Sequence, residues 1–311
     1  MDFMLNKKKI YFAAIFVAGF ACLSMVVFPS IAFLSAQKGI SLWAGSVLPA
    51  LLPFFICANF MNEMGVTRVL NPAAFAFSMS VLSGYPMGAK IIGDLRRNEY
   101  IGEREAKRML SFCSTSGPAF MLGAVGTGML RNPMLGMIIA ISHYLGAVLN
   151  GLFFSLRFRK EKDESRKIRR LPKLKDDDKG VLEFFTDAIF SSFKSLGIIL
   201  AYIMLFMFFT DLMQFSGILN IFEQSYMRAL AKGILEMTVG CASIASSMEI
   251  SDLLKGVFCT FLISWGGLSV IGQTMSMLTG CKISLTYFIT TKLGHCIFSS
   301  IIALIMGILL L

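Results

Sequence analysis

Charged residues are scarce in this chain. They make up 15% of its 311 residues, while hydrophobic residues make up 56%. A water-soluble globule needs about a quarter of its residues charged to cover its surface. The shortage excludes a soluble enzyme, a secreted disulfide scaffold and a disordered protein, and it makes lipid the expected solvent for most of the chain.

Catalytic and metal-binding motifs are missing as well. The sequence contains no HExxH pair for a zinc protease and no glycine-rich Walker loop for a nucleotide. Its seven cysteines form no CxxC pair, and most lie within apolar runs, where cysteine packs as a small hydrophobic residue. The sequence therefore predicts no enzyme, no catalytic residue, no metal site and no cofactor.

The positive charge is concentrated between the apolar runs. The formal net charge is +10, but the chain has no RNA-binding pattern, zinc-finger spacing or basic helix interleaved with aromatics. Basic clusters between apolar runs are typical of cytoplasmic loops beside anionic lipid. A lipid bilayer, and no nucleic acid, is thus the expected partner. The clusters at 7–9 and 157–180 predict a cytoplasmic N-terminus and a cytoplasmic loop in a multi-pass protein of the cell membrane.

Uncharged runs long enough to cross a bilayer follow one another along the chain, since a transmembrane helix needs about 20 apolar residues. They predict an N-terminal transmembrane helix in 1–38, a first repeat in 39–156, a basic linker in 157–180 and a second repeat in 181–311. The start of the second repeat, 181–193, is apolar on one side and is interpreted as a helix lying in the membrane interface.

The two repeats match each other at an offset of 152 residues. Gly88 then faces Gly240, and after a two-residue adjustment STSGP (114–118) faces SWGGL (264–268). Placing the basic stretch 94–108 in the cytoplasm, together with the other basic clusters, makes the two repeats antiparallel. The predicted fold is all-α: a transmembrane bundle of about seven spans with inverted-topology repeats and two re-entrant, broken-helix hairpins.

Inverted repeats with broken helices are an architecture of secondary transporters. A helix broken at membrane depth frees backbone N–H and C=O groups, which lipid cannot satisfy. These groups must face protein or a water-filled cavity, where they can bind a polar solute.

The most distinctive break lies in SGYPMGAKIIGD, residues 83–94, because its glycines and proline make a continuous helix unfavourable. Its hydroxyls and its lysine suit either a solute site or a capped turn with the lysine snorkelling to the headgroups. The hydroxyl-rich segment that follows suits either an exposed half-helix end or packing through small residues. The candidate solute-binding residues of this repeat are Ser83, Gly84, Tyr85, Pro86, Gly88, Lys90, Ser114, Ser116 and Gly117.

A carboxylate occupies the corresponding place in the second repeat. Glu236 lies in a short apolar run, where it is either a functional group or wetted at the interface. Lys292 and His295 share one helix face and are interpreted as partners that compensate the charge of Glu236; intramembrane histidines are often structural, an interpretation that also applies to His143. The candidate solute-binding residues here are Glu236, Thr238, Gly240, Gly266, Gly267, Ser269 and Gln273. The candidates for coupling or charge compensation are Asp94, Lys292 and His295.

At these strings the chain resembles the YlbJ family of sporulation integral membrane proteins, which is grouped with nucleoside-recognition or Gate domains. The resemblance rests on SGYPMGAKIIGD, EREAKRMLSFCSTSGPAFMLGAVG, LEMTVG, WGGLSVIGQ and KLGH, spread from about residue 40 to the C-terminus. Met87 and Ile271 depart from the family pattern. The resemblance implies a multi-pass protein needed for spore cortex formation, and the Gate kinship implies transport by analogy of fold.

Two hypotheses on function follow. The first is a secondary transporter that moves a small-molecule or ion substrate by alternating access, for which replacing Glu236 or Gln273 is harmful. The second is a non-transporting membrane scaffold for cortex-assembly proteins, for which deleting the 157–180 linker is harmful instead. Cortex-assembly proteins or further copies of the chain are additional partners to expect.

Overall fold

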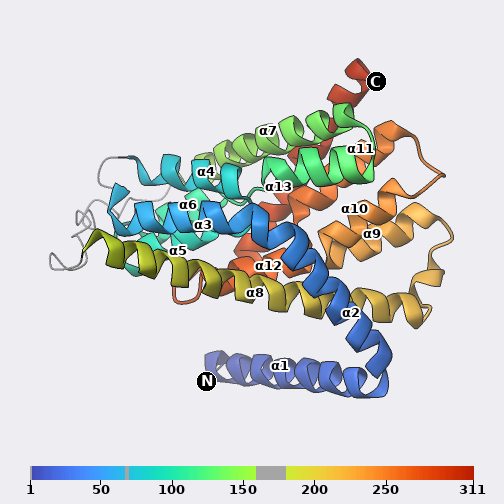
Figure 1. The fold of residues 1–311 in the computed structure, drawn as a ribbon, viewed down its shortest axis with the longest axis horizontal. Helices are drawn as coiled ribbons and strands as arrows, with labels where there is room; N and C mark the ends of the chain where they lie inside the picture. The colour runs from blue at the N-terminus through green and yellow to red at the C-terminus, as the bar shows by residue number, and fades with distance from the viewer. Residues whose placement is uncertain (1, 67–69, 159–179) are drawn as a thin grey trace.

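The computed structural model describes residues 2–66, 70–158 and 180–311. Every regular element in these ranges is a helix, which confirms the all-α prediction (Figure 1). Most of the linker predicted over 157–180 lies outside the described residues.

Several helices have the length and hydropathy of membrane spans. Four such stretches occur among the described residues: Pro133–Arg157, Val181–Phe215, Asp252–Met277 and Leu285–Leu310. A bent pair, Ile15–Val27 with Pro29–Gly45, makes a fifth if it counts as one span. These spans support a multi-pass membrane protein. They are fewer than the seven expected, because several apolar runs fold as two short helices rather than one long helix.

The N-terminal helix differs from its prediction. α1 (Asp2–Val27) and α2 (Pro29–Leu42) meet at 104°, and α1 lies apart from the bundle in Figure 1. Pro29 has no N–H to give to a preceding turn and suits the first position of a new helix. The chain therefore bends at Phe28 and continues as helix through the boundary expected at residue 38.

α2 leads through a π-helical turn, η1 (Trp43–Val47), into α3 (Leu48–Glu63), and this path packs along α8. Four hydrogen bonds join it to α8. Trp43 Nε1 donates to Leu196 O at 3.0 Å and Asn59 Nδ2 donates to Ser192 Oγ at 2.8 Å, while Ser35 and Lys38 of α2 both donate to Asp211 Oδ2. These polar contacts fix the register of the two paths.

α8 (Val181–Phe215) is a single helix of 35 residues. The interfacial helix expected over 181–193 is not separate from it. At 1.5 Å per residue α8 is about 52 Å long, which exceeds the roughly 30 Å hydrocarbon core of a bilayer. One end of α8 therefore extends beyond the hydrocarbon.

The same order of elements follows α3 and α8: two interrupted helix pairs and then a long helix. After α3 come α4 (Pro72–Ser83), α5 (Met87–Arg97), α6 (Glu103–Leu110), π-helical η3 (Ala119–Met129) and α7 (Pro133–Phe158). After α8 and a short 3-10 turn, η5 (Ile218–Ile221), come α9 (Ser225–Leu235), α10 (Met237–Ala245), α11 (Asp252–Trp265), α12 (Gly267–Met277) and α13 (Leu285–Leu310).

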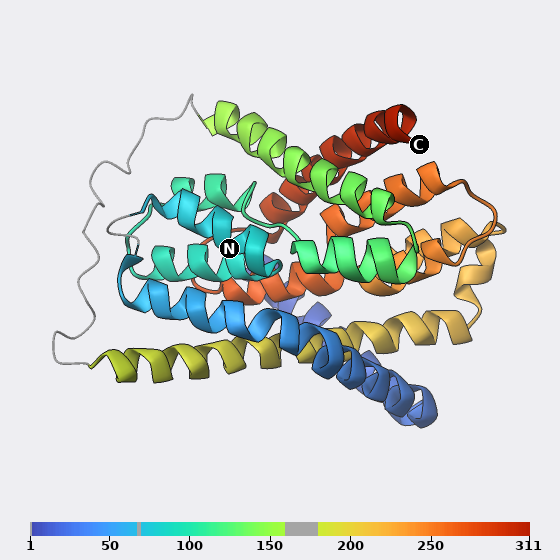
Figure 2. The same cartoon turned by 45° about the horizontal axis from the view of Figure 1, so that its top comes forward.

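The two long closing helices, α7 and α13, pack against each other (Figure 2). Glycines on each helix admit polar side chains of the other: a Cβ at Gly146 would collide with Ser299, and one at Gly294 would collide with Asn150. This close approach brings the middle of α7 and the middle of α13 to the centre of the molecule, where the helix breaks also lie.

The turns of the two halves lie at opposite ends of the bundle. The α5–α6 turn lies at the end where α8 begins, and the α10–α11 turn lies at the other end (Figure 1). Arg97 Nη1 donates to Met277 O at 2.8 Å, and Tyr287 Oη donates to Lys107 O at 2.8 Å, so the α12–α13 turn shares the end of the α5–α6 turn.

Candidate functional site

The helix breaks touch in pairs through their backbones. Gly84, at φ +75°, ends α4, and a Cβ there would lie 2.6 Å from Gly117 N. Gly267, also at φ +75°, begins α12, and a Cβ there would lie 2.9 Å from Leu235 O and 3.2 Å from Glu236 Cα. Only glycine combines this left-handed conformation with such contact. The first pair joins the α4–α5 and α6–η3 breaks, and the second joins the α9–α10 and α11–α12 breaks.

Ser80 satisfies the backbone groups that the first pair of breaks sets free. Its hydroxyl donates to Cys113 O at 2.7 Å and accepts from Thr115 N at 3.2 Å. Polar backbone groups at this depth need such partners, because lipid offers none. Sequence reasoning did not select Ser80, since a serine inside an apolar helix carries no positional signal.

Lys292 is the buried cation at the centre of the breaks. Its side chain is among the largest fully buried ones, and the residue is 1% exposed. Its Nζ donates to Tyr85 Oη at 2.7 Å and to Ser114 O at 3.2 Å, and lies 4.5 Å from the centroid of the Tyr85 ring. Tyr85 Oη donates onward to Ile263 O at 3.1 Å. In the described ranges no carboxylate lies within ion-pair distance of Lys292.

Glu236 does not form the expected pair with Lys292 or His295. Its carboxylate caps α10 instead, and its Oε2 accepts from Val239 N at 2.8 Å. A negative charge is favourable there because the N-terminus of a helix carries partial positive charge. Glu236 is only 3% exposed, so it is a buried cap and not a group wetted at the interface.

His143 joins the two halves, although sequence reasoning gave it no functional role. Its Nε2 accepts from Ser116 N at 2.9 Å, and its Nδ1 lies 2.8 Å from Ser264 Oγ. Its ring centroid lies 4.6 Å from that of His295, whose Nε2 lies 2.9 Å from His143 O. The two histidines are 152 residues apart, which is the offset that aligns the glycines of the two repeats predicted from the sequence. That spacing was the signal that could have found His143.

Two hydroxyls at the first pair of breaks have no partner. Ser83 Oγ and Ser114 Oγ are both buried without a hydrogen bond. Buried polar atoms in proteins are nearly always paired. These two, one of them on the residue whose carbonyl contacts Lys292, therefore have hydrogen-bonding capacity that their surroundings leave unused.

Lys90 and Asp94 form a separate network on α5. Lys90 Nζ donates to Asn59 Oδ1 at 2.7 Å and to Asp94 Oδ2 at 3.1 Å, and Asp94 Oδ1 accepts from Arg97 Nη2 at 2.6 Å. Lys90 is buried, so it does not snorkel to the headgroups. Lys90 thus joins α5 to α3 through Asn59, and Asp94 bonds two basic residues of its own helix. Neither of these two predicted site residues forms a hydrogen bond with Lys292.

Several other candidates serve packing. Gly88 lies against Cys113 O, and Gly240 lies against the backbone of Gly233, so each permits close helix contact. Gln273 Nε2 donates to Ser269 Oγ at 3.1 Å, which satisfies part of this buried amide within α12. The remaining candidates lie at the breaks: Pro86 precedes α5, Gly266 ends α11 at φ +84°, and Thr238 is in the first turn of α10.

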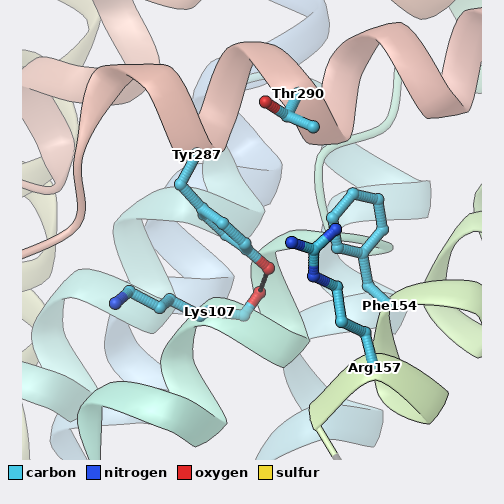
Figure 3. Close-up of a pocket in the computed structure, with 5 residues that line it drawn as sticks. All are labelled: Lys107, Phe154, Arg157, Tyr287 and Thr290. Carbon is cyan, nitrogen blue, oxygen red and sulfur yellow. Dashed lines mark hydrogen bonds between the residues drawn. The ribbon is translucent and has the colours of Figure 1, made fainter.

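A cavity lies away from the breaks, where α6, α7 and α13 meet (Figure 3). Its volume is about 190 Å³, and it is lined by Lys107, Phe154, Arg157, Tyr287 and Thr290. In Figure 3 the Arg157 guanidinium points toward the Tyr287 hydroxyl, while the Lys107 ammonium points away. None of the five was a candidate site residue.

Together, the apolar spans and the buried polar centre define a multi-pass helical membrane protein. No protein-family model and no solved structure matches the chain. Over 92% of its length the chain is 27% identical to "Sporulation integral membrane protein YlbJ" of Bacillus subtilis (strain 168), of which the match covers 80%. This match supports the YlbJ family as the family of the chain.

Proposed function

We propose that this chain is a secondary transporter for a small solute with an anionic group. The observation that carries the proposal is Lys292, a buried ammonium with no carboxylate partner in the described ranges. Leaving a charge unpaired inside a membrane protein is costly, and such a residue is a functional candidate by default. A carboxylate or phosphate of the solute would complete the pair, with the free hydroxyls of Ser83 and Ser114 as further donors.

The helix ends around Lys292 favour an anion as well. α5, η3 and α12 all begin at the breaks, and none has a side-chain cap at its N-terminus. Each of these N-termini carries partial positive charge. Among the four helices that begin at the breaks, only α10 has a carboxylate at its N-terminus, that of Glu236, which offsets the partial positive charge there.

We further propose that the two halves are inverted-topology repeats that rock about this centre. The recurring order of elements supports this, as do the corresponding contacts of Gly84 with Gly117 and of Glu236 with Gly267. The facing pair of His143 and His295 also supports it. Rocking would expose Lys292 first to one side of the membrane and then to the other, as in known transporters built from inverted repeats.

The proposed orientation puts the N-terminus, the 157–180 loop and the α5–α6 turn in the cytoplasm. Basic residues gather near that turn, as the positive-inside rule requires. They are Arg96, Arg97, Arg104, Lys107 and Arg108. The cavity in Figure 3 would then open toward the cytoplasm.

The biological setting of the proposal is sporulation. The relative's name describes a sporulation membrane protein, and we propose the same setting here, with a contribution to cortex formation. Kinship with nucleoside-recognition or Gate domains belongs to the same proposal. The proposal includes no catalytic activity, no metal and no cofactor. Its scaffold alternative depends on a linker that lies largely outside the described residues, and deletion of 159–179 tests it.

Flux measurements in proteoliposomes test the transport proposal. The probes are radiolabelled carboxylates, a phosphate ester, a neutral nucleoside and an organic cation. Wild-type protein should carry at least one anionic probe, and Lys292→Met should lower its flux at least about tenfold, the effect of losing one charged hydrogen-bonded contact.

Lys90→Met is the matched control, because Lys90 is also a buried lysine but already has Asp94 as its partner. It should keep most of the anion flux, provided that the folded fraction is equal. Absence of flux for every anion, or equal loss in both variants, would contradict the proposal.

A further inference from the structure

We infer that His143 is the proton-binding site of the transport cycle, and that binding of a proton there releases the α6–η3 break from α7. This inference rests on the proposed transport function and names its coupling ion. It comes from the hydrogen bonds that a single buried imidazole makes to both halves of the molecule.

The bond from Ser116 fixes the protonation state of the ring. Because Ser116 N–H donates to Nε2, that nitrogen carries no proton in this structure. A neutral imidazole then holds its proton on Nδ1, which donates to Ser264 Oγ. Ser116 belongs to the first pair of breaks, and Ser264 lies two residues before the Gly266 break. The neutral ring therefore connects one break from each half.

Adding a proton changes only the Nε2 side of this connection. The imidazolium carries N–H on both nitrogens, so Nε2 stops accepting and meets the Ser116 N–H donor to donor. The Nδ1–H bond to Ser264 is kept. One proton taken from the aqueous side thus removes the bond between α7 and the α6–η3 break, the same break whose Ser114 carbonyl contacts Lys292. Its later release on the other side restores the bond.

The groups around His143 make proton binding depend on the solute. Facing the ring are Tyr85 from the α4–α5 break and Tyr144 from its own helix, at centroid distances of 6.5 and 5.6 Å. His295 faces it from α13 and Ser264 faces it from α11. Lys292, also on α13, donates to the hydroxyl of the same Tyr85 that faces the ring. No carboxylate forms an ion pair with this group in the described ranges.

A proton on His143 therefore adds a second positive charge near the ammonium of Lys292. Like charges in a low dielectric repel each other, so the protonated state is unfavourable while the centre is empty. An anionic solute offsets both charges. By linkage, the proton then strengthens binding of the anion as much as the anion strengthens binding of the proton, which is the thermodynamic condition for cotransport.

The chain offers a fluorescent reporter beside this contact. It has two tryptophans, and Trp265 follows Ser264 directly. In a Trp43→Phe background, Trp265 becomes the single tryptophan. Its fluorescence is recorded in nanodiscs between pH 5 and pH 8, the interval in which histidine is the side chain that ordinarily titrates. The anionic probes of the flux measurements are present at high concentration, because the protonated ring is unfavourable while the centre is empty. The chain contains only two histidines, so one variant of each shows whether a titration arises from His143, from His295 or from neither.

We expect a titration that is lost in His143→Gln and retained in His295→Gln. Glutamine can accept from Ser116 N–H and donate to Ser264, so His143→Gln should fold while remaining unable to take up a proton. Amide hydrogen exchange of the wild-type segment 111–118 provides a second readout that needs no variant. With the same anionic probes present, and after correction for the intrinsic effect of pH, exchange in this segment should rise at least about tenfold at pH 5.5, and less so in His143→Gln.

Persistence of the titration in His143→Gln, or pH-independent exchange in the wild-type segment, would overturn the inference. Neither readout requires solute flux. A titration that depends on His143 without any anion flux would therefore reject transport and keep the proton-dependent contact. Anion flux without that titration would keep transport and reject His143 as the proton-binding site.

Discussion

Lys292 shows how far one side chain departs from what stability alone would select. Taking an ammonium out of water costs several kcal/mol, and hydrogen bonds to neutral oxygens recover only part of this. Tyr85 and Ser114 supply those oxygens. At the scale of the residue, the buried charge is a cost that a purely structural position would avoid.

Replacement of Lys292 by methionine should therefore leave the stability unchanged or raise it, even as it removes anion flux. Lys90→Met should have the opposite effect. It leaves the buried Asn59 Oδ1 without its donor, at a cost of about 1–3 kcal/mol. Thermal midpoints of the purified variants, followed by size-exclusion chromatography, give the comparison. A lower midpoint for Lys292→Met than for Lys90→Met would speak against a functional origin of the buried charge.

Glu236 should behave as a helix cap. Glu236→Ala removes the acceptor for Val239 N and should lower stability by about 1 kcal/mol. Glu236→Gln keeps an amide oxygen in its place and should lose less. Anion flux should stay within about threefold of wild type in Glu236→Gln, since a cap is not a solute contact. A tenfold loss of anion flux with unchanged stability would indicate that Glu236 contacts the solute after all.

At the scale of the element, the breaks depend on glycines that no other residue can replace. Gly267 and Gly280 share a positive φ, of +75° and +83°. A Cβ at Gly267 would meet the backbone of Leu235 and Glu236, whereas nothing lies within 4 Å of one at Gly280. Alanine substitutions at these two positions therefore distinguish the free-energy cost of backbone strain from the cost of steric contact.

Gly280→Ala should cost only the strain, about 1–2 kcal/mol. Gly267→Ala should cost at least about 3 kcal/mol, because overpacking adds to the strain. Unfolding of both variants in the same detergent, monitored by circular dichroism, measures the difference. Equal costs would mean that the two breaks of the second half are not in contact.

The sequence predicted these elements well where the signal is local. Glycine and proline marked the breaks at Gly84 and Gly266, and long apolar runs marked α7 and α13. It failed where partners are distant in the chain. The pairing of Lys292 with Tyr85 spans 207 residues, and no local pattern carries it. The length of α8 was missed because Glu183, Asp187 and Lys194 interrupt its hydropathy without interrupting the helix.

At the scale of the whole molecule, the proposed inversion of the repeats makes a prediction about sidedness. Asn98 lies in the α5–α6 turn and Met248 in the α10–α11 turn, and both are exposed. These turns lie at opposite ends of the bundle in Figure 1. In a background without the exposed Cys22 and Cys57, a membrane-impermeant thiol reagent should label Met248→Cys in intact cells and should label Asn98→Cys only after the cells are opened. Labelling of both from outside would exclude the inverted arrangement.

The glycine contacts between the breaks have one more consequence, which is mechanical. Interdigitated side chains must change rotamers before two packed surfaces can slide, and this is why most protein interiors transmit strain rather than shear. Where Gly84 meets Gly117, two bare backbones face each other with no side chain to interlock. No side chain has to change its rotamer before these two segments slide past each other, so we expect relative motion of the segments to begin at this contact.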